Sequence, residues 1–247
     1  MLYCDINCDM GEEIGNDELI MPFISSANIA CGAHAGSDKT MYETVLLAKR
    51  YNIKIGAHPS FLDRKNFGRV EMKTTPLEIY NIVTDQIRAL QNIAEKAKCK
   101  LHHVKPHGAL YNMAAKDQII AASIAMAVKD CDQQLKVYGL SNSFLISESR
   151  SIGLKTVSEV FADRTYLDDG SLTPRSKPNA LISDPQEAIQ QVLRMIKTGK
   201  VRTTSNKEIP IFAESVCIHG DGKNAVEFSK EINAALIKEN ITIGSLE

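Results

Sequence analysis

Four of the six histidines stand directly after separate short apolar runs of the chain: His34, His58, His107 and His219. Each run has the length and composition of a buried β-strand. In a parallel β/α barrel the carboxyl ends of all strands open on one face. We therefore expect these four side chains to share a pocket, although any one of them alone could be a structural imidazole. His102 and His103 lie inside the fourth run instead.

Acidic residues follow the same placement. Asp9 follows the first run, Glu159 and Asp163 flank the end of the sixth, and Asp221 follows the seventh. Within the first run, polar residues alternate with apolar ones, so that Asp5, Asn7 and Asp9 should point to one face of the strand. Inward-pointing polar groups must be paired, which suits the floor of an active site.

Lys105 lies in the apolar segment Leu101–His107, where an ammonium is costly unless it is paired with a carboxylate or with substrate. Arg164 and Arg175 lie in the long loop after the sixth run. Their forked guanidinium groups suit a carboxylate or a phosphate, although a solvated salt bridge is an equally good interpretation.

Two other chemistries stay open. Convergent His34, His58 and Asp9 could hold a divalent metal ion, although no His-Glu-x-x-His motif marks a metal site. Cys31 could be a nucleophile beside a histidine, but a cysteine at a strand end is more often buried and inert.

Seven apolar runs, each followed by a polar loop and most by a helical pattern, indicate β/α units. The runs are Leu2–Cys8, Ala27–Cys31, Ile53–Ala57, Leu101–Lys105, Leu135–Leu140, Thr156–Phe161 and Ala213–Ile218. A closed barrel is favoured over an open sheet, because polar residues follow nearly every run and no dinucleotide fingerprint is present. We predict an α/β fold, a seven-stranded (β/α) barrel.

Helix signals lie between these runs. Thr75-Pro76-Leu77-Glu78 combines a cap, a proline at the first helical position and a glutamate three residues after the cap, and Asp184-Pro185-Gln186-Glu187 repeats it. Further helices are expected over 38–51, 117–129 and 224–239. Asn142 is expected to cap a helix that stops near Gly153, and Gly199 to end the helix that Asp184 begins.

Composition limits the class of protein. The chain has 247 residues, 44% of them hydrophobic, and a formal net charge of -1. We expect a single barrel domain over 1–247 and, without a basic tract or a long apolar stretch, neither a nucleic-acid nor a membrane partner. The six cysteines form no Cys-x-x-Cys pair, and Asp5 comes too early for the apolar part of a signal peptide. These features predict a reduced, cytoplasmic protein.

Longer motifs resemble the LamB/YcsF family, whose members are also known as the A subunit of 5-oxoprolinase. The resemblance is carried by the segments Asp5–Glu12, Ser26–Gly36, Ile55–Pro59, His103–Asn112, Glu159–Arg164, Pro174–Ser176 and Cys217–Asp221. Cys8, Met10 and Ala33 replace residues more usual in the family, but none of these changes removes an ionisable group.

The resemblance implies a barrel related to glycoside hydrolases and polysaccharide deacetylases. It also implies ATP-dependent hydrolysis of the lactam 5-oxo-L-proline to L-glutamate, together with two partner subunits, B and C. ATP would be a co-substrate, but the Gly-x4-Gly-Lys-Ser/Thr motif is absent. ATP could therefore bind in this chain, in a partner or between them.

Physical reasoning assigns roles to the polar residues. A phosphorylated lactam oxygen makes the ring carbon electrophilic, after which water needs a base and the leaving nitrogen an acid. Asp9, His34 or His58 would supply the base, and Lys105 and His107 would stabilise negative charge. We expect catalytic roles for these five and for Asp163, His219 and Asp221, and substrate binding by Asn7, Asn28, Glu159, Arg164 and Arg175.

Alanine replacements of Asp9, Lys105 and His107 are expected to abolish turnover without lowering the melting temperature. The alternatives are a metal-dependent deacetylase of N-acetylated sugars and a non-catalytic subunit that delivers a ligand. The number of inward ionisable groups weighs against the second.

Overall fold

Seven parallel strands close into a barrel in the computed structural model, which describes residues 2–222 and 224–245. In order around the barrel they are β1 (Tyr3–Met10), β2 (Ser26–Ala30), β3 (Lys54–His58), β4 (His103–Val104), β5 (Lys136–Leu140), β6 (Thr156–Phe161) and β9 (Ser215–Ile218). The barrel closes because β1 pairs with β2 on one side and with β9 on the other. This confirms the predicted seven-stranded (β/α) barrel.

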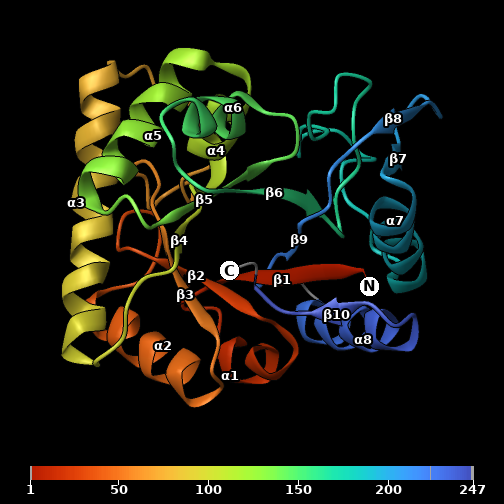
Figure 1. The fold of residues 1–247 in the computed structure, drawn as a ribbon, viewed down its shortest axis with the longest axis horizontal. Coiled ribbons are helices and arrows are strands. Elements are labelled where there is room, and N and C mark those ends of the chain that lie inside the picture. Colours follow the sequence, from red (N-terminus) through yellow and green to blue (C-terminus); the bar gives the residue numbers. More distant parts are fainter. Residues whose placement is uncertain (1, 223, 246–247) are drawn as a thin grey trace.

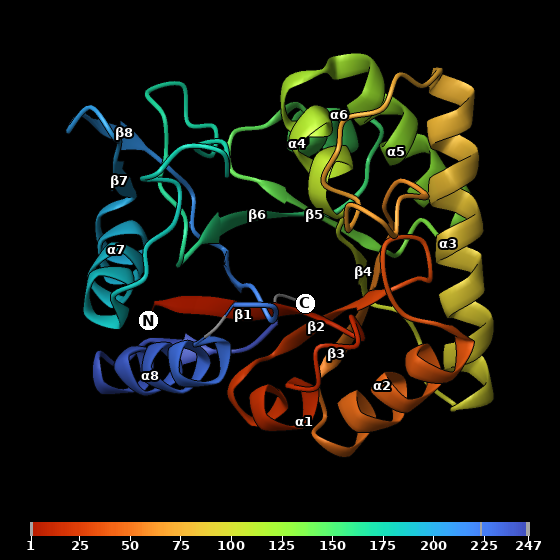
Figure 2. The same ribbon diagram turned by 180° about the vertical axis from the view of Figure 1, so that it is seen from behind.

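Helices surround the strands in both views of the molecule (Figures 1 and 2). They are α1 (Asp17–Ile20), the short 3-10 helix Met21–Phe23, α2 (Asp38–Arg50), α3 (Pro76–Lys96), α4 (Gly108–Lys116), α5 (Gln118–Cys131), α6 (Phe144–Ser151), α7 (Pro185–Thr198) and α8 (Ala225–Lys238). The largest helix contact joins α3 to α5. Across the described ranges, no helix is long and apolar enough to cross a membrane.

Helix boundaries follow the predicted signals at two of three places. Thr75 and Glu78 form a reciprocal capping box at the start of α3. Asp184 caps α7, which ends at Gly199 in the left-handed conformation, at φ 64°. Glycine is favoured there because a Cβ is strained at positive φ.

The predicted cap of α6 is wrong by one residue. Ser143 accepts the hydrogen bond from the backbone N–H of Ile146 and so begins the helix. Asn142 has φ 64°, and its side-chain amide donates to the carbonyl of Pro210. It therefore serves the turn that precedes the helix.

Six elements were not expected, among them α1 and the 3-10 helix Met21–Phe23. Helix α4 begins directly after His107, in a segment for which the sequence predicts no helix. The long segment after β6 includes the hairpin of β7 (Lys200–Arg202) and β8 (Glu208–Pro210), which packs beside α7 (Figure 1). Strand β10 (Thr242–Ile243) extends the sheet at the start of β1. The single-domain organisation stays a prediction.

Strand β4 is shorter than its apolar run because Pro106 cannot donate to a ladder. The backbone N–H of Lys105 still bonds to the carbonyl of Ala57, at 2.9 Å. Lys105 thus leaves the strand while still held to β3, at the mouth of the barrel.

Candidate active site

A pocket of about 370 Å³ lies at the carboxyl ends of the strands, and side chains at the ends of six of them line it. Asp9 comes from β1, His58 from β3, Lys105 and His107 follow β4, and His219 follows β9. His34 lies next to the pocket, with its ring stacked on that of His107 at 3.8 Å between centroids. The structure therefore brings together the four strand-end histidines.

Lys105 is buried at the centre of this floor. Its ammonium nitrogen lies 3.0 Å from Asp9 Oδ1, 2.9 Å from Glu159 Oε1, 3.1 Å from Asn7 Oδ1 and 3.0 Å from Cys217 Sγ. Burial would lower the pKa of Lys105, but the two carboxylates and the neighbouring sulfur hold it well above its usual value. Lys105 is therefore a fixed cation that holds the floor together.

Asp9 is held as a carboxylate. Burial would raise its pKa, but His58 and Lys105 hold the pKa well below its usual value. Asp9 Oδ2 lies 3.3 Å from His58 Nε2, and Oδ1 accepts a hydrogen bond from the Asn28 amide at 2.9 Å. The carboxylate is thus ionised, and Lys105 and Asn28 orient it.

Asn28 is in turn oriented from inside the barrel. Its amide oxygen accepts a hydrogen bond from His103 Nε2 at 2.8 Å, and its amide nitrogen also donates to Asn7 Oδ1 at 2.7 Å. The ring of His103 fills the space beside Gly56, where any Cβ would overlap it. Hence His103, predicted only as a strand residue, supports Asp9 through Asn28.

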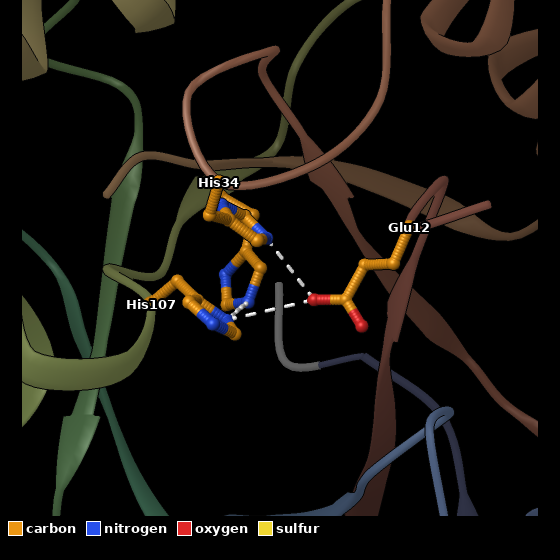
Figure 3. Close-up of side chains that lie close together, drawn as sticks. Glu12, His34 and His107 are labelled. Atoms are coloured by element: carbon orange, nitrogen blue, oxygen red, sulfur yellow. Dashed lines mark hydrogen bonds and ion pairs between the residues drawn. The ribbon is translucent and has the colours of Figure 1, made fainter. Parts of the chain in front are cut away.

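Glu12 contacts His34 and His107 (Figure 3). Its Oε1 lies 3.1 Å from His34 Nε2 and 3.5 Å from His107 Nδ1. His58 Nε2 lies 2.9 Å from His107 Nδ1. One donor atom of each of the four residues lies within 4.8 Å of all the others, a spacing at which they could hold a metal ion.

Burial shifts the protonation of this cluster. It lowers the pKa of His34 to about 3 and, with the neighbouring histidines, the pKa of His107 well below its usual value. Burial and the charge of Asp9 raise the pKa of Glu12. The predicted metal set of His34, His58 and Asp9 is only partly grouped here, because Asp9 is grouped with Cys217 and His219.

His219 and Asp163 form a pair on the opposite wall of the pocket. His219 Nδ1 lies 2.9 Å from both oxygens of Asp163, so Nδ1 donates its proton to the carboxylate. Burial would raise the pKa of Asp163, but His219 and Arg175 lower it. A carboxylate that fixes one ring nitrogen leaves the other available for acid–base work.

The two arginines differ. Arg164 is buried and donates to the carbonyls of Thr173 and Ala180, so it holds the loop after β6 in shape. Arg175 is exposed, and both arginines line the pocket. Asp221 forms an ion pair with Arg69 at the pocket rim.

Sequence reasoning missed Glu12, Cys217 and Tyr111, which donates to Glu159 at 2.6 Å. Glu12 had a signal, because it ends the polar loop after the first run. Tyr111 had only its place in the segment His103–Asn112 as a signal, since helix α4, on which it lies, was not expected. Cys31 is buried, and burial raises the pKa of its thiol to about 12, which disfavours a nucleophile there.

Comparison with known proteins gives consistent matches along the whole chain. The sequence profile of the LamB/YcsF family matches residues 4–247. The A subunit of 5-oxoprolinase from Shouchella clausii (strain KSM-K16) is 55% identical over 244 residues, covering 97% of this chain and 96% of that protein. The A subunit of 5-oxoprolinase from Staphylococcus aureus (strain MRSA252) is 50% identical, covering 98% and 99%.

Solved structures also resemble this chain along its whole length. The lactam utilization protein from Thermus thermophilus superposes with a TM-score of 0.92 at 41% identity, covering 99% of this chain and 100% of that one. The catalytic domain of a peptidoglycan N-acetylglucosamine deacetylase from Eubacterium rectale has a TM-score of 0.52 at 12% identity, covering 100% and 88%. The second likeness concerns the fold alone.

Proposed function

Because the chain belongs to the LamB/YcsF family, we propose that it is the A subunit of a 5-oxoprolinase. It would hydrolyse the lactam of 5-oxo-L-proline to L-glutamate, with ATP as co-substrate and with two partner subunits, B and C. The observation that carries the proposal is the pocket floor, where an ionised Asp9, a fixed Lys105 and His219, which is paired with Asp163, face one cavity.

The reaction needs activation before water can attack. The lactam oxygen takes the γ-phosphoryl group of ATP, releasing ADP, and the ring carbon becomes electrophilic. Water adds to this carbon as it loses a proton to a base, and the C–N bond breaks as the nitrogen gains a proton. The resulting acyl phosphate reacts with a second water to give glutamate and phosphate.

Asp9 is the proposed base for the attacking water, since it is ionised and lines the pocket. Lys105 stabilises the negative charge that develops on the substrate oxygens. His219, oriented by Asp163, is proposed to protonate the leaving nitrogen.

Arg175 is proposed to bind the substrate carboxylate, because its guanidinium group is exposed in the pocket. Arg164 is better assigned to the shape of the loop, because backbone carbonyls accept its hydrogen bonds. A divalent cation at the Glu12 cluster is proposed as a second cofactor beside ATP. Deacetylation of N-acetylated sugars has only a fold likeness at 12% identity to support it.

The test is ATP-dependent release of glutamate from 5-oxoproline by the chain mixed with its purified partner subunits. Asp163→Asn should reduce kcat by about 10²-fold or more, because His219 loses its oriented proton, which is the scale of general acid catalysis. Asp130→Asn is the matched control, since the Asp130 carboxylate accepts a hydrogen bond from the exposed hydroxyl of Tyr80, outside the pocket. Glutamate release at the wild-type rate by Asp163→Asn would contradict the role of His219. The absence of release by the wild-type assembly would contradict the proposed reaction.

A further inference from the structure

Two histidines of the Glu12 cluster have their tautomers fixed by backbone carbonyls. His58 Nδ1 lies 2.7 Å from the carbonyl oxygen of Lys105, and His107 Nε2 lies 3.0 Å from that of Phe67. A carbonyl oxygen only accepts, so each of these nitrogens carries a hydrogen. A neutral ring then has a lone pair on its other nitrogen, which is Nε2 in His58 and Nδ1 in His107.

The third tautomer is fixed by a hydroxyl. Ser60 Oγ donates its hydrogen to the carbonyl of Phe61 at 2.9 Å. It must therefore accept from His34 Nδ1, which lies 2.9 Å away. His34 Nε2 is left with a lone pair that faces Glu12 Oε1 at 3.1 Å.

These assignments place acceptors against acceptors. The lone pairs of His58 and His107 face each other at 2.9 Å, and Glu12 faces those of His34 and His107. Buried groups arranged in this way repel one another unless positive charge lies between them. Added protons or a bound cation would supply that charge.

We propose that Glu12, His34, His58 and His107 bind one divalent transition-metal ion, of which Zn²⁺ is the type. Three imidazole nitrogens and a carboxylate oxygen suit zinc and its neighbours. Bonds of about 2.0–2.2 Å in a tetrahedron place neighbouring donors roughly 3.3–3.6 Å apart. The pairs at 2.9, 3.1 and 3.5 Å need shifts of only a few tenths of an ångström. Since the rings of His34 and His107 are stacked, one of them must also turn for both lone pairs to reach the ion.

The groups that bond to the other nitrogen of each ring, the one that does not face the ion, also match those around a bound metal. Metal-binding histidines ordinarily donate their second N–H to a carbonyl, a carboxylate or water, which fixes the ring and raises its basicity. Here two of the three bond to carbonyls and the third to a hydroxyl that a carbonyl holds. The hydrogen-bond partners of all three rings are therefore of the kinds found around metal-binding histidines.

The role of the ion rests on the proposed function, whereas its binding does not. His58 and His107 line the pocket, so the ion would lie at its floor beside Asp9. When bound, it would place positive charge beside Asp9 and fix the three rings, because four protein donors leave a tetrahedral ion no open position.

The binding test uses the full chain, treated with a chelator, loaded with Zn²⁺ or Co²⁺ and desalted. Elemental analysis should give about one metal ion per chain, and Co²⁺ should show the visible absorption of a tetrahedral complex. Ser60→Ala, which removes only the partner of His34, should weaken binding about 10- to 100-fold. The double variant His34→Ala/His107→Ala should retain no ion, while Cys217→Ser, in the neighbouring group, should bind as the wild type does.

Failure of the wild type to retain either ion would overturn the proposal, as would full retention by the double variant. Thermal unfolding shows whether the double variant folds. If it does not fold, the metal affinity of Ser60→Ala still tests the proposal. Metal binding without lactam hydrolysis would leave this proposal standing and count against the proposed function.

Discussion

Removal of the Lys105 ammonium, in Lys105→Met, is the sharpest perturbation of the pocket floor. The side chain is 3% exposed and pairs with Asp9 and Glu159, which are 5% and 0% exposed. Breaking a buried ion pair from one side costs about 3–5 kcal/mol, because the other charge stays buried without a partner. The contacts therefore predict that the variant loses stability as well as activity. The sequence alone predicted a loss of activity without a lower melting temperature.

The expected magnitude follows from the size of the chain. About 4 kcal/mol corresponds to a fall in Tm of roughly 8–16 °C, at about 2–4 °C per kcal/mol for a chain of this length. Adding Glu159→Gln should restore part of the loss, because one of the two uncompensated carboxylates then becomes neutral. Lys207→Met is the control, since its ion pair with Asp168 is exposed and solvent screens it, so that its loss should change Tm little.

The loss of stability in Lys105→Met should also depend on pH. The folded-state pKa of Asp9 is depressed, so its pairing stabilises the fold above the unfolded pKa of about 3.9 and less as pH falls through the folded value. The difference in Tm between wild type and variant should therefore be largest near pH 7 and narrow in acid. Calorimetry at several pH values measures it. A variant that melts within about 2 °C of wild type at pH 7 would refute the reasoning.

Three other substitutions test separate parts of the structure. Gly56→Ala should cost about 1–3 kcal/mol, because its Cβ would overlap the His103 ring, and denaturant unfolding measures this. Thr75→Ala should cost about 1 kcal/mol by losing the capping box with Glu78, with kcat unchanged in the glutamate assay. Cys31→Ala should retain kcat within about threefold, since a buried thiol with a raised pKa is not a nucleophile; a loss beyond about 100-fold would show otherwise.

The order of strands and most helix boundaries could be predicted from the chain because they depend on neighbouring residues. An apolar run predicts a strand, and Thr75-Pro76-Leu77-Glu78 predicts a helix start through contacts made within four residues. Helix α4 was harder, because no capping side chain precedes it: His107 stands at its cap position without a side-chain hydrogen bond. The hairpin β7–β8 was missed because its strands are three residues long.

The convergence of the strand-end histidines was also a consequence of sequence, once a barrel was inferred. Their residue types and their places after separate strands determined that a polar pocket would form at one face. Tertiary structure decided what each does. Glu12 rather than Asp9 joins the histidine cluster, Arg164 shapes a loop, and His103 reaches Asp9 through Asn28. These outcomes depend on distances of about 3 Å between residues far apart in the chain, which only packing fixes.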